Sequence, residues 1–328
     1  MELSVGFLKA LTKHPPKEAW DAIVQRVFET CSKPLTPGNA ASEVTRRDRE
    51  VGTLDLFLSS AGWDLWGRFE EVVDCTSDRL SAWWSEPHTA KAVLVLDSLS
   101  LRELPWLLQG ASERGMKTGI VAATASELPS DTTQFAQALG FGQRSSLSNN
   151  GAGPTKWAPL RTECDNLPWL DCAAGIDANP HWLYWHHWPD NKVHELAAAG
   201  HGLDMLIKET ADRLTSDDFW TLIDRLSNGR RLVITSDHGY AATGLFIDSP
   251  DDQATFLKDA FKSGRAVEGK EGAGPWVPPV ALALNSRHGE YLYALGRRKW
   301  KSPGGYPTLS HGGLSLLEVL CPFVEIYK

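Results

Sequence analysis

At four places along the chain, aspartate or histidine side chains stand where a predicted strand ends or in a glycine-rich turn, and three of these places follow an apolar run. The residues are Asp97 in VLVLD, Asp190 and His194 in PDNKVH, Asp237 and His238 in VITSDHG, and His311 in the glycine-rich SHGG. Open α/β sheets place their sites just beyond the C-terminal ends of buried strands. Carboxylates and imidazoles from four such segments suit a pair of divalent metals, which can clamp the attacking and leaving oxygens of a phosphoryl transfer.

Some of these residues also have a purely structural interpretation. The alternative role of Asp97 is the N-cap of the helix that follows it, a position that favours aspartate. Asp237 and His238 are alternatively turn residues, and His311 is alternatively a surface histidine. The agreement of four segments, each at a strand end or in a glycine turn, favours the metal site.

A concentrated basic run at residues 296–301 lies shortly before His311. Its residues Arg297, Arg298, Lys299 and Trp300 combine positive charge with an aromatic ring. Sites for single-stranded nucleic acid use this combination to follow the phosphates and to stack a base. The run therefore predicts a phosphate or nucleic-acid contact, with a solvated hairpin end as the alternative.

The elements that must position these residues change in type near residue 90. Residues 1–90 carry apolar side chains at helical spacing and predict a helical cap or a partner-docking region. Beyond them, apolar runs predict strands at 92–96, 118–123, 182–188, 231–235, 280–284 and 291–295, with helices at 101–114, 193–214, 217–226 and 314–320. This alternation predicts an α/β domain over residues 91–328, with a central, mostly parallel sheet flanked by helices.

Residues 141–180 are rich in Gly, Ser, Asn and Pro, which predicts a long irregular excursion over the surface. His186 and His187 follow in a predicted strand. Because neighbouring side chains of a strand point to opposite faces, we expect one to face the core and one the site, neither as a ligand.

Composition argues against several classes of protein. A net charge of -8 gives no basic field for coating nucleic acid, although bound metals would reverse the charge of an acidic site. Five scattered cysteines without a CxxC pair argue against a disulfide framework and a thiolate zinc site. The sequence shows no signal peptide and no apolar run near the ~20 residues that span a bilayer, so we expect a cytoplasmic protein without membrane contact.

Five motifs resemble, in order, those of the PglZ domain, a branch of the alkaline phosphatase superfamily found in bacterial phage-defence systems of the BREX type. The motifs are VLVLDSL, LPSDTTQFAQAL, PDNKVH, VITSDHGY and SHGGLSLLEVLCPFV. They cover roughly residues 91–328. The resemblance implies an alkaline-phosphatase-like fold for this part of the chain.

The resemblance also implies a role for each site residue. One metal would be held by Asp97, Asp237 and His238, and the other by Asp190, His194 and His311. The expected metal is Zn²⁺, with Mn²⁺ or Mg²⁺ as alternatives. The nucleophile would be Thr132, with Ser130 and Thr133 as alternatives in register and a helix N-cap as its structural interpretation. The family commonly has an arginine three positions after the first aspartate; Ser100 stands there, so Arg102 is the expected phosphate ligand.

Together these features predict a metal-dependent phosphodiesterase, expected to be a nuclease, that works with other defence-system proteins. The alternatives within the same chemistry are a phosphomonoesterase and a cyclic-nucleotide phosphodiesterase, because a metal site does not identify the leaving group. The alternative from another class is a non-catalytic scaffold subunit of a defence complex. A scaffold would be expected to have lost some ligands, and the complete set argues against it.

Overall fold

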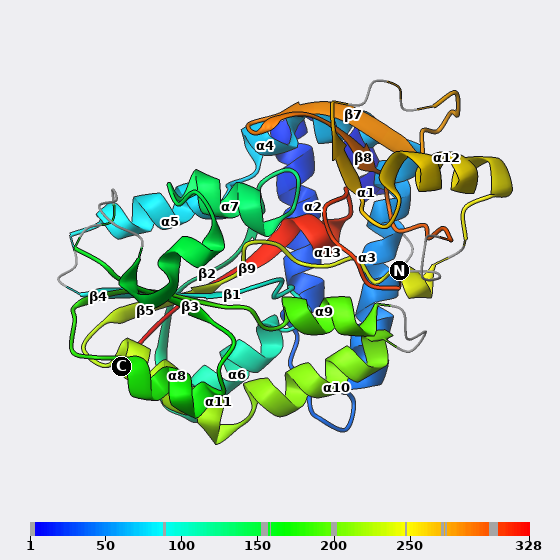
Figure 1. Cartoon of the computed structure of the whole chain (residues 1–328). Helices are drawn as coiled ribbons and strands as arrows, with labels where there is room; N and C mark the ends of the chain where they lie inside the picture. The colour runs from blue at the N-terminus through cyan, green and yellow to red at the C-terminus, as the bar shows by residue number, and fades with distance from the viewer. Residues whose placement is uncertain are drawn as a thin grey trace.

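The computed structural model describes residues 4–87, 90–151, 157, 159–197, 202–246, 248–269, 272, 274–301 and 308–328. A six-stranded sheet carries helices on both faces, and a smaller three-stranded sheet lies beside it (Figure 1). Among the described residues, no helix combines the length and the apolar character needed to cross a bilayer.

The large sheet has the strand order β2-β9-β5-β1-β4-β3. Its strands are β1 (Lys91–Leu96), β2 (Lys117–Ala125), β3 (Arg161–Asp165), β4 (His181–His186), β5 (Arg231–Thr235) and β9 (Leu320–Tyr327). β1 pairs in parallel with β4 and β5, and β3 pairs in parallel with β4. β9 runs antiparallel to its neighbours β2 and β5. The predicted α/β fold with a mostly parallel central sheet is therefore confirmed.

β1 is buried along its whole length because both faces of the sheet are covered. Val93 and Val95 pack into a hydrophobic cluster on one face. Leu94 and Leu96 point the other way and pack into the main core. When successive side chains of a strand pack into two apolar layers in turn, all of them are apolar in the sequence, as in the run VLVL at 93–96.

The helices of the first 87 residues are α1 (Val5–Lys13), α2 (Pro16–Cys31), α3 (Ala40–Ser60), η1 (Trp63–Arg68), α4 (Phe69–Val72) and α5 (Thr76–Ser85). Those of the remaining chain are α6 (Leu104–Glu113), α7 (Thr132–Ala138), η2 (Arg144–Asn150), α8 (Trp169–Gly175), α9 (Asp190–Leu196), α10 (Gly202–Leu214), α11 (Asp217–Ser227), η3 (Thr243–Leu245), α12 (Asp251–Phe261) and α13 (Leu316–Val319). The small antiparallel sheet has the order β6-β8-β7, from β6 (Ala266–Glu268), β7 (Ala281–Ser286) and β8 (Gly289–Ala294).

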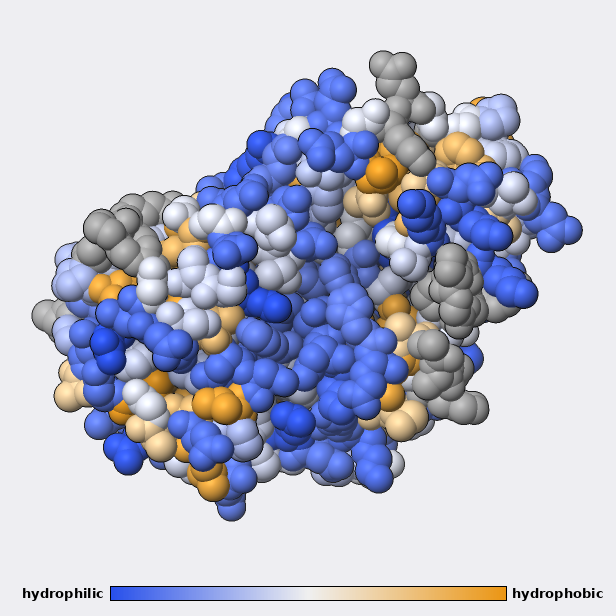
Figure 2. Space-filling view, in the orientation of Figure 1, coloured by the Kyte–Doolittle hydropathy of each residue, from blue (hydrophilic) through white to orange (hydrophobic). Residues whose placement is uncertain are grey.

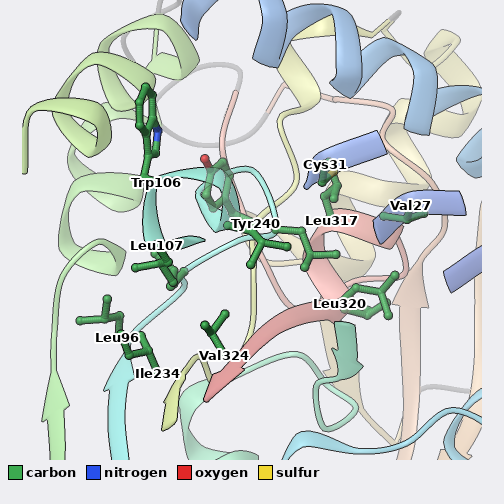
Figure 3. Packing of buried hydrophobic residues seen from close by; sticks show 14 of the residues in the cluster. Val27, Cys31, Leu96, Trp106, Leu107, Ile234, Tyr240, Leu317, Leu320 and Val324 are labelled. Atoms are coloured by element: carbon green, nitrogen blue, oxygen red, sulfur yellow. The ribbon is translucent and has the colours of Figure 1, made fainter. Parts of the chain in front are cut away.

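The N-terminal helices share the hydrophobic core of the sheet. Val27 and Cys31 of α2 belong to the same cluster as Leu317 of α13 and Leu320 of β9 (Figure 3). On the other face of the sheet, Trp83 of α5 packs into the second cluster. The predicted boundary at residue 90 lies between α5 and β1 in the sequence, but hydrophobic packing continues across it.

Three predictions about elements need correction. The stretch 141–180 is not irregular throughout, because it contains η2, β3 and α8. The predicted helix at 314–320 is the short α13, and the chain then continues as β9. In β9, Phe323 packs into one apolar layer and Val324 into the other, which stabilises a strand there. The predicted helix at 193–214 is two helices, α9 and α10; residues 198–201 between them lie outside the described residues.

Candidate active site

The parallel strands β1, β4 and β5 end at the same edge of the sheet, and the predicted site residues follow these ends. Asp97 follows β1, Asp237 and His238 follow β5, and Asp190 begins α9 shortly after β4. His311 lies before α13. In Figure 2 hydrophilic residues fill the middle of the face on which α7, α9 and α13 approach one another in Figure 1.

Asp97, Asp237 and His238 form one cluster, called here the first ligand group, with one ligand atom of each within 4.8 Å of the others. All three residues are fully buried. His238 Nε2 lies 3.4 Å from Asp237 Oδ2 and 3.8 Å from Asp97 Oδ1. The other ring nitrogen, Nδ1, lies 2.9 Å from Gly239 O, so it carries a proton and donates there. This bond orients the ring so that Nε2 faces the two carboxylates.

Asp190, His194 and His311 form the second ligand group, again with ligand atoms within 4.8 Å of one another. The two imidazole Nε2 atoms are 3.3 Å apart, and they lie 3.4 Å (His194) and 3.6 Å (His311) from the Asp190 carboxylate. His311 Nδ1 lies 3.2 Å from Ser130 O, which turns its Nε2 toward the group. Asp190 Oδ1 is buried and has no hydrogen-bond partner among the described residues. A cation at this place would satisfy that oxygen.

The two ligand groups adjoin each other. The Asp190 backbone N–H donates to Asp97 O at 3.0 Å. The rings of His238 and His311 stack with their centroids 4.2 Å apart. Each group offers carboxylate oxygen and imidazole nitrogen, the donor types that Zn²⁺ accepts, so the residues present fit two divalent cations held side by side.

The carboxylates of the site repel one another and favour bound protons. Burial, followed by repulsion from Asp237 and Asp190, raises the pKa of Asp97 well above its ordinary value. Burial lowers the pKa of His238, but the carboxylates of Asp237, Asp97 and Asp190 outweigh it and raise that pKa to about 9. Protons are thus held where a divalent cation would displace them.

Thr132 lies at the first ligand group. Its Oγ1 is 2.9 Å from Asp237 Oδ2 and 3.3 Å from Asp97 Oδ1. The N-cap of α7 is Asp131, whose side chain accepts from the Thr133 N–H, so Thr132 is the first helical residue and its hydroxyl is not used for capping. The register alternative Ser130 is fully buried, and its Oγ accepts from the Gly312 N–H. The geometry therefore favours Thr132 over Ser130 as the side chain that meets the carboxylates.

Arg144 is a site residue that the sequence patterns do not predict. Its Nη1 donates to Asp97 Oδ2, and Trp185 Nε1 donates to the same oxygen at 3.0 Å. Its side chain is 27% exposed, so part of it is accessible to solvent. The only signal in the sequence is that 141–180 is a long excursion, and such loops are uncommon unless they cover something.

The prediction that Arg102 binds phosphate is wrong. Its side chain is buried, and its Nε donates to Asp48 Oδ2 at 2.6 Å. Its Nη1 donates to Ser100 Oγ and to Tyr240 O at 3.0 and 2.8 Å. These partners hold the guanidinium under the loop that carries His238, where a substrate cannot reach it.

Two residues of the basic run, Arg297 and Trp300, are not accessible for the predicted phosphate or nucleic-acid contact. Arg297 is buried and pairs with Asp48 and Asp55 of α3. Trp300 is buried in the cluster beneath the small sheet, so its ring is not free to stack on a base. Two further cations of the run have protein partners: Lys299 Nζ lies 2.7 Å from Asp248 Oδ1, and Arg298 Nη1 donates to Gln253 Oε1 at 2.9 Å.

The neighbouring histidines His186 and His187 have partners outside the two ligand groups. His186 is buried, with Nε2 2.9 Å from Leu167 O and Nδ1 accepting from the Trp188 N–H. It lies near Asp165 and Cys172, which together make a third cluster of possible ligands. Because both nitrogens of His186 already have protein partners, this cluster is a weaker candidate for a metal than the two ligand groups.

No family model matches the chain, and no curated protein matches its sequence. Its structure is similar to that of murine ectonucleotide pyrophosphatase/phosphodiesterase 5 in an inactive form with AMP, at 12% identity over 73% of this chain and 88% of that chain, with a TM-score of 0.46. The human form of that protein is 12% identical over 72% of this chain and 87% of its own chain, with a TM-score of 0.44. Phosphonoacetate hydrolase from Sinorhizobium meliloti 1021 is 14% identical over 73% of this chain and 90% of its own chain, with a TM-score of 0.40. At these TM-scores the likenesses carry no argument about the site.

Proposed function

We propose that this protein is a metal-dependent phosphoric ester hydrolase that attacks its substrate with Thr132. The observation that carries the proposal is the position of the Thr132 hydroxyl, 2.9 Å from Asp237 and 3.3 Å from Asp97, with the second ligand group adjoining. A hydroxyl between carboxylates that fit a dication is the arrangement expected of an activated nucleophile.

In the proposed reaction Thr132 Oγ1 loses its proton to water and attacks phosphorus; a cation held by Asp97, Asp237 and His238 would favour the deprotonated hydroxyl. The bond from phosphorus to the leaving alcohol breaks, which leaves a phosphothreonine ester that water then hydrolyses. Divalent cations held by the two ligand groups would neutralise the carboxylates and stabilise charge on the attacking and leaving oxygens. Arg144 is placed to bind a non-bridging phosphate oxygen, because its guanidinium reaches the same carboxylate as the nucleophile.

The finer parts of the proposal rest on the motifs. Their resemblance to the PglZ domain supports a phosphodiesterase that cleaves nucleic acid, uses Zn²⁺ and acts in the cytoplasm with partner proteins of a phage-defence system. The side chain of His194 is 62% exposed, so a substrate can approach the second ligand group from that side. The basic run does not add support, because Arg297 and Trp300 are buried.

The test compares p-nitrophenyl phosphate, bis-p-nitrophenyl phosphate and labelled DNA, each with Zn²⁺ or Mn²⁺, and measures metal content in protein purified without chelator. Asp237→Ala is the inactivating variant, and Asp171→Ala, an exposed aspartate of α8, is the matched control. We expect about two metals per chain and hydrolysis of the diesters by the wild type and the control only.

Other outcomes identify other functions. Preference for the monoester would indicate a phosphomonoesterase. Well under one metal per chain, with no hydrolysis of any ester, would indicate the scaffold. Hydrolysis retained in Asp237→Ala would overturn the mechanism.

A further inference from the structure

The tip of the β7–β8 hairpin, Arg287 and His288, contacts three carboxylates that are far from it in the sequence. Arg287 Nη1 lies 2.6 Å from Asp78 Oδ2, and the Arg287 N–H donates to Glu70 Oε2 at 3.1 Å. The next residue, His288, places its Nε2 2.9 Å from Glu127 Oε2. The hairpin tip therefore makes two separate contacts, one with the N-terminal helices and one with the segment that follows β2.

Glu127 is a buried carboxylate with three side-chain partners. It is 1% exposed, and its Oε1 accepts from Cys75 Sγ at 2.9 Å and from the Ser77 hydroxyl. Burial raises its pKa, but the hydrogen bonds from His288, Cys75 and Ser77 outweigh burial and leave the pKa below its usual value. Glu127 is thus held as a carboxylate by partners from α5 and from the hairpin.

The segment 126–131 joins this anchor to the nucleophile. At its start, the Ser126 N–H donates to Val319 O at 2.8 Å. At its end, Ser130 accepts from Gly312 and from His311, and Asp131 then caps α7, which begins with Thr132. Between these two ends, Leu128 packs into the main core, and Glu127 is the residue whose side chain makes polar contacts with other segments.

We propose that Glu127 and His288 are a positioning pair that fixes the segment 126–131, so that the Thr132 hydroxyl stays against Asp237 and Asp97. The catalytic part of this proposal rests on the proposed function. Without His288, Glu127 loses the partner that links it to the hairpin, and the start of α7 gains freedom. The ligands Asp97, Asp190 and Asp237 come from other segments and keep their positions. His311 contacts Ser130 O, but the backbone pairing of Ser310 with Ala241 holds it independently of this segment. A reacting group misplaced by about 1 Å loses up to about a hundredfold in rate.

The alternative is that His288 only docks the hairpin and has no influence on Thr132. Asp78→Asn is the matched control, because it removes an ion pair of the same hairpin tip without touching residues 126–131. His288→Ala removes the contact under test, and His288→Gln restores a donor of similar reach.

The first measurement is hydrogen–deuterium exchange of peptides that cover residues 126–133, which does not depend on activity. We expect faster exchange in His288→Ala than in Asp78→Asn or the wild type, and wild-type exchange in His288→Gln. Equal exchange in His288→Ala and Asp78→Asn would overturn the proposal.

The second measurement is kcat and KM for bis-p-nitrophenyl phosphate, with metal content determined in parallel. We expect kcat of His288→Ala to fall by about tenfold to a hundredfold at unchanged KM and metal content, and Asp78→Asn to stay within about twofold of the wild type. A kcat in His288→Ala equal to that of Asp78→Asn would overturn the catalytic part. If the wild type itself hydrolyses no ester, the proposed function has failed, and the exchange measurement alone decides whether His288 fixes the segment.

Discussion

Thr132 Oγ1 lies 2.9 Å from Asp237 Oδ2, although the two residues are 105 positions apart in the sequence. If Thr132 is the nucleophile, Thr132→Ala removes the atom that becomes phosphorylated. We expect kcat to fall by on the order of 10³ or more, and Thr132→Ser to retain activity. Acid-quenched protein analysed by mass spectrometry should carry a phosphoryl adduct on the peptide that contains residue 132 in the wild type and not in Thr132→Ala. Metal content should be the same in all three proteins, and an active Thr132→Ala would exclude this residue as nucleophile.

Arg144 is expected to stabilise the phosphoryl group during transfer. Its guanidinium already reaches Asp97, so Arg144→Ala should lower kcat/KM by about 10² to 10³, the range for loss of one preorganised donor at a transition state. Arg144→Lys should recover part of the loss, because an ammonium supplies charge but not a planar fork. Arg161→Ala, on the partly exposed edge strand β3, is the control and should behave as the wild type. Inhibition constants for orthovanadate provide a second measurement, and equal inhibition of Arg144→Ala and the wild type would contradict this role.

The sequence predicts the part of the fold that rests on local pattern. β1 and β5 are recognisable because strands covered on both faces carry a continuous apolar run, AVLVL in β1 and LVI in β5. β9 is not recognisable in this way, because LCPFVEIY contains Pro322 and Glu325. Glu325 is buried and is satisfied by Trp83 Nε1 at 2.7 Å and by Arg231. Partners so distant in the sequence leave no local pattern.

Contacts between residues distant in the sequence also limit which site residues can be predicted. The ligand residues follow strand ends or precede a short helix, so the topology that brings them together can be inferred from local pattern. Arg144 has no motif around it, and its contact with Asp97 depends on how η2 folds back over the sheet. Arg297 looked like a surface cation because its partners Asp48 and Asp55 are 249 and 242 residues away.

Asp48 is expected to be essential for stability, because it is buried between Arg102 and Arg297. Asp48→Ala would leave two buried guanidinium groups short of a partner, and breaking a buried pair from one side destabilises by about 3–5 kcal/mol. Lys17→Ala, which breaks an exposed pair with Asp21, should change the free energy of unfolding by less than about 1 kcal/mol. Urea unfolding of both variants measures the difference, and similar values for the two would show that the buried network does not support the fold.

Metal removal should make the stability of the protein fall as the pH rises. In the metal-free protein the pKa of His238 is raised from 6.5 to about 9. A raised folded-state pKa stabilises the protein below pH 6.5, and this stabilisation is lost as the pH rises through about 9. Metal binding requires the neutral imidazole, so the affinity for Zn²⁺ should increase over the same interval.

The melting temperature in chelator should therefore fall between pH 6.5 and pH 9, and the increase produced by added Zn²⁺ should become larger. His238→Asn should weaken both trends, because it removes one titrating group of the site, and Asp97, whose pKa is also raised, remains. Thermal unfolding at several pH values, with and without Zn²⁺, measures both trends in melting temperature. A Zn²⁺-induced increase of the same size at both ends of this interval would show that His238 does not exchange its proton for the metal.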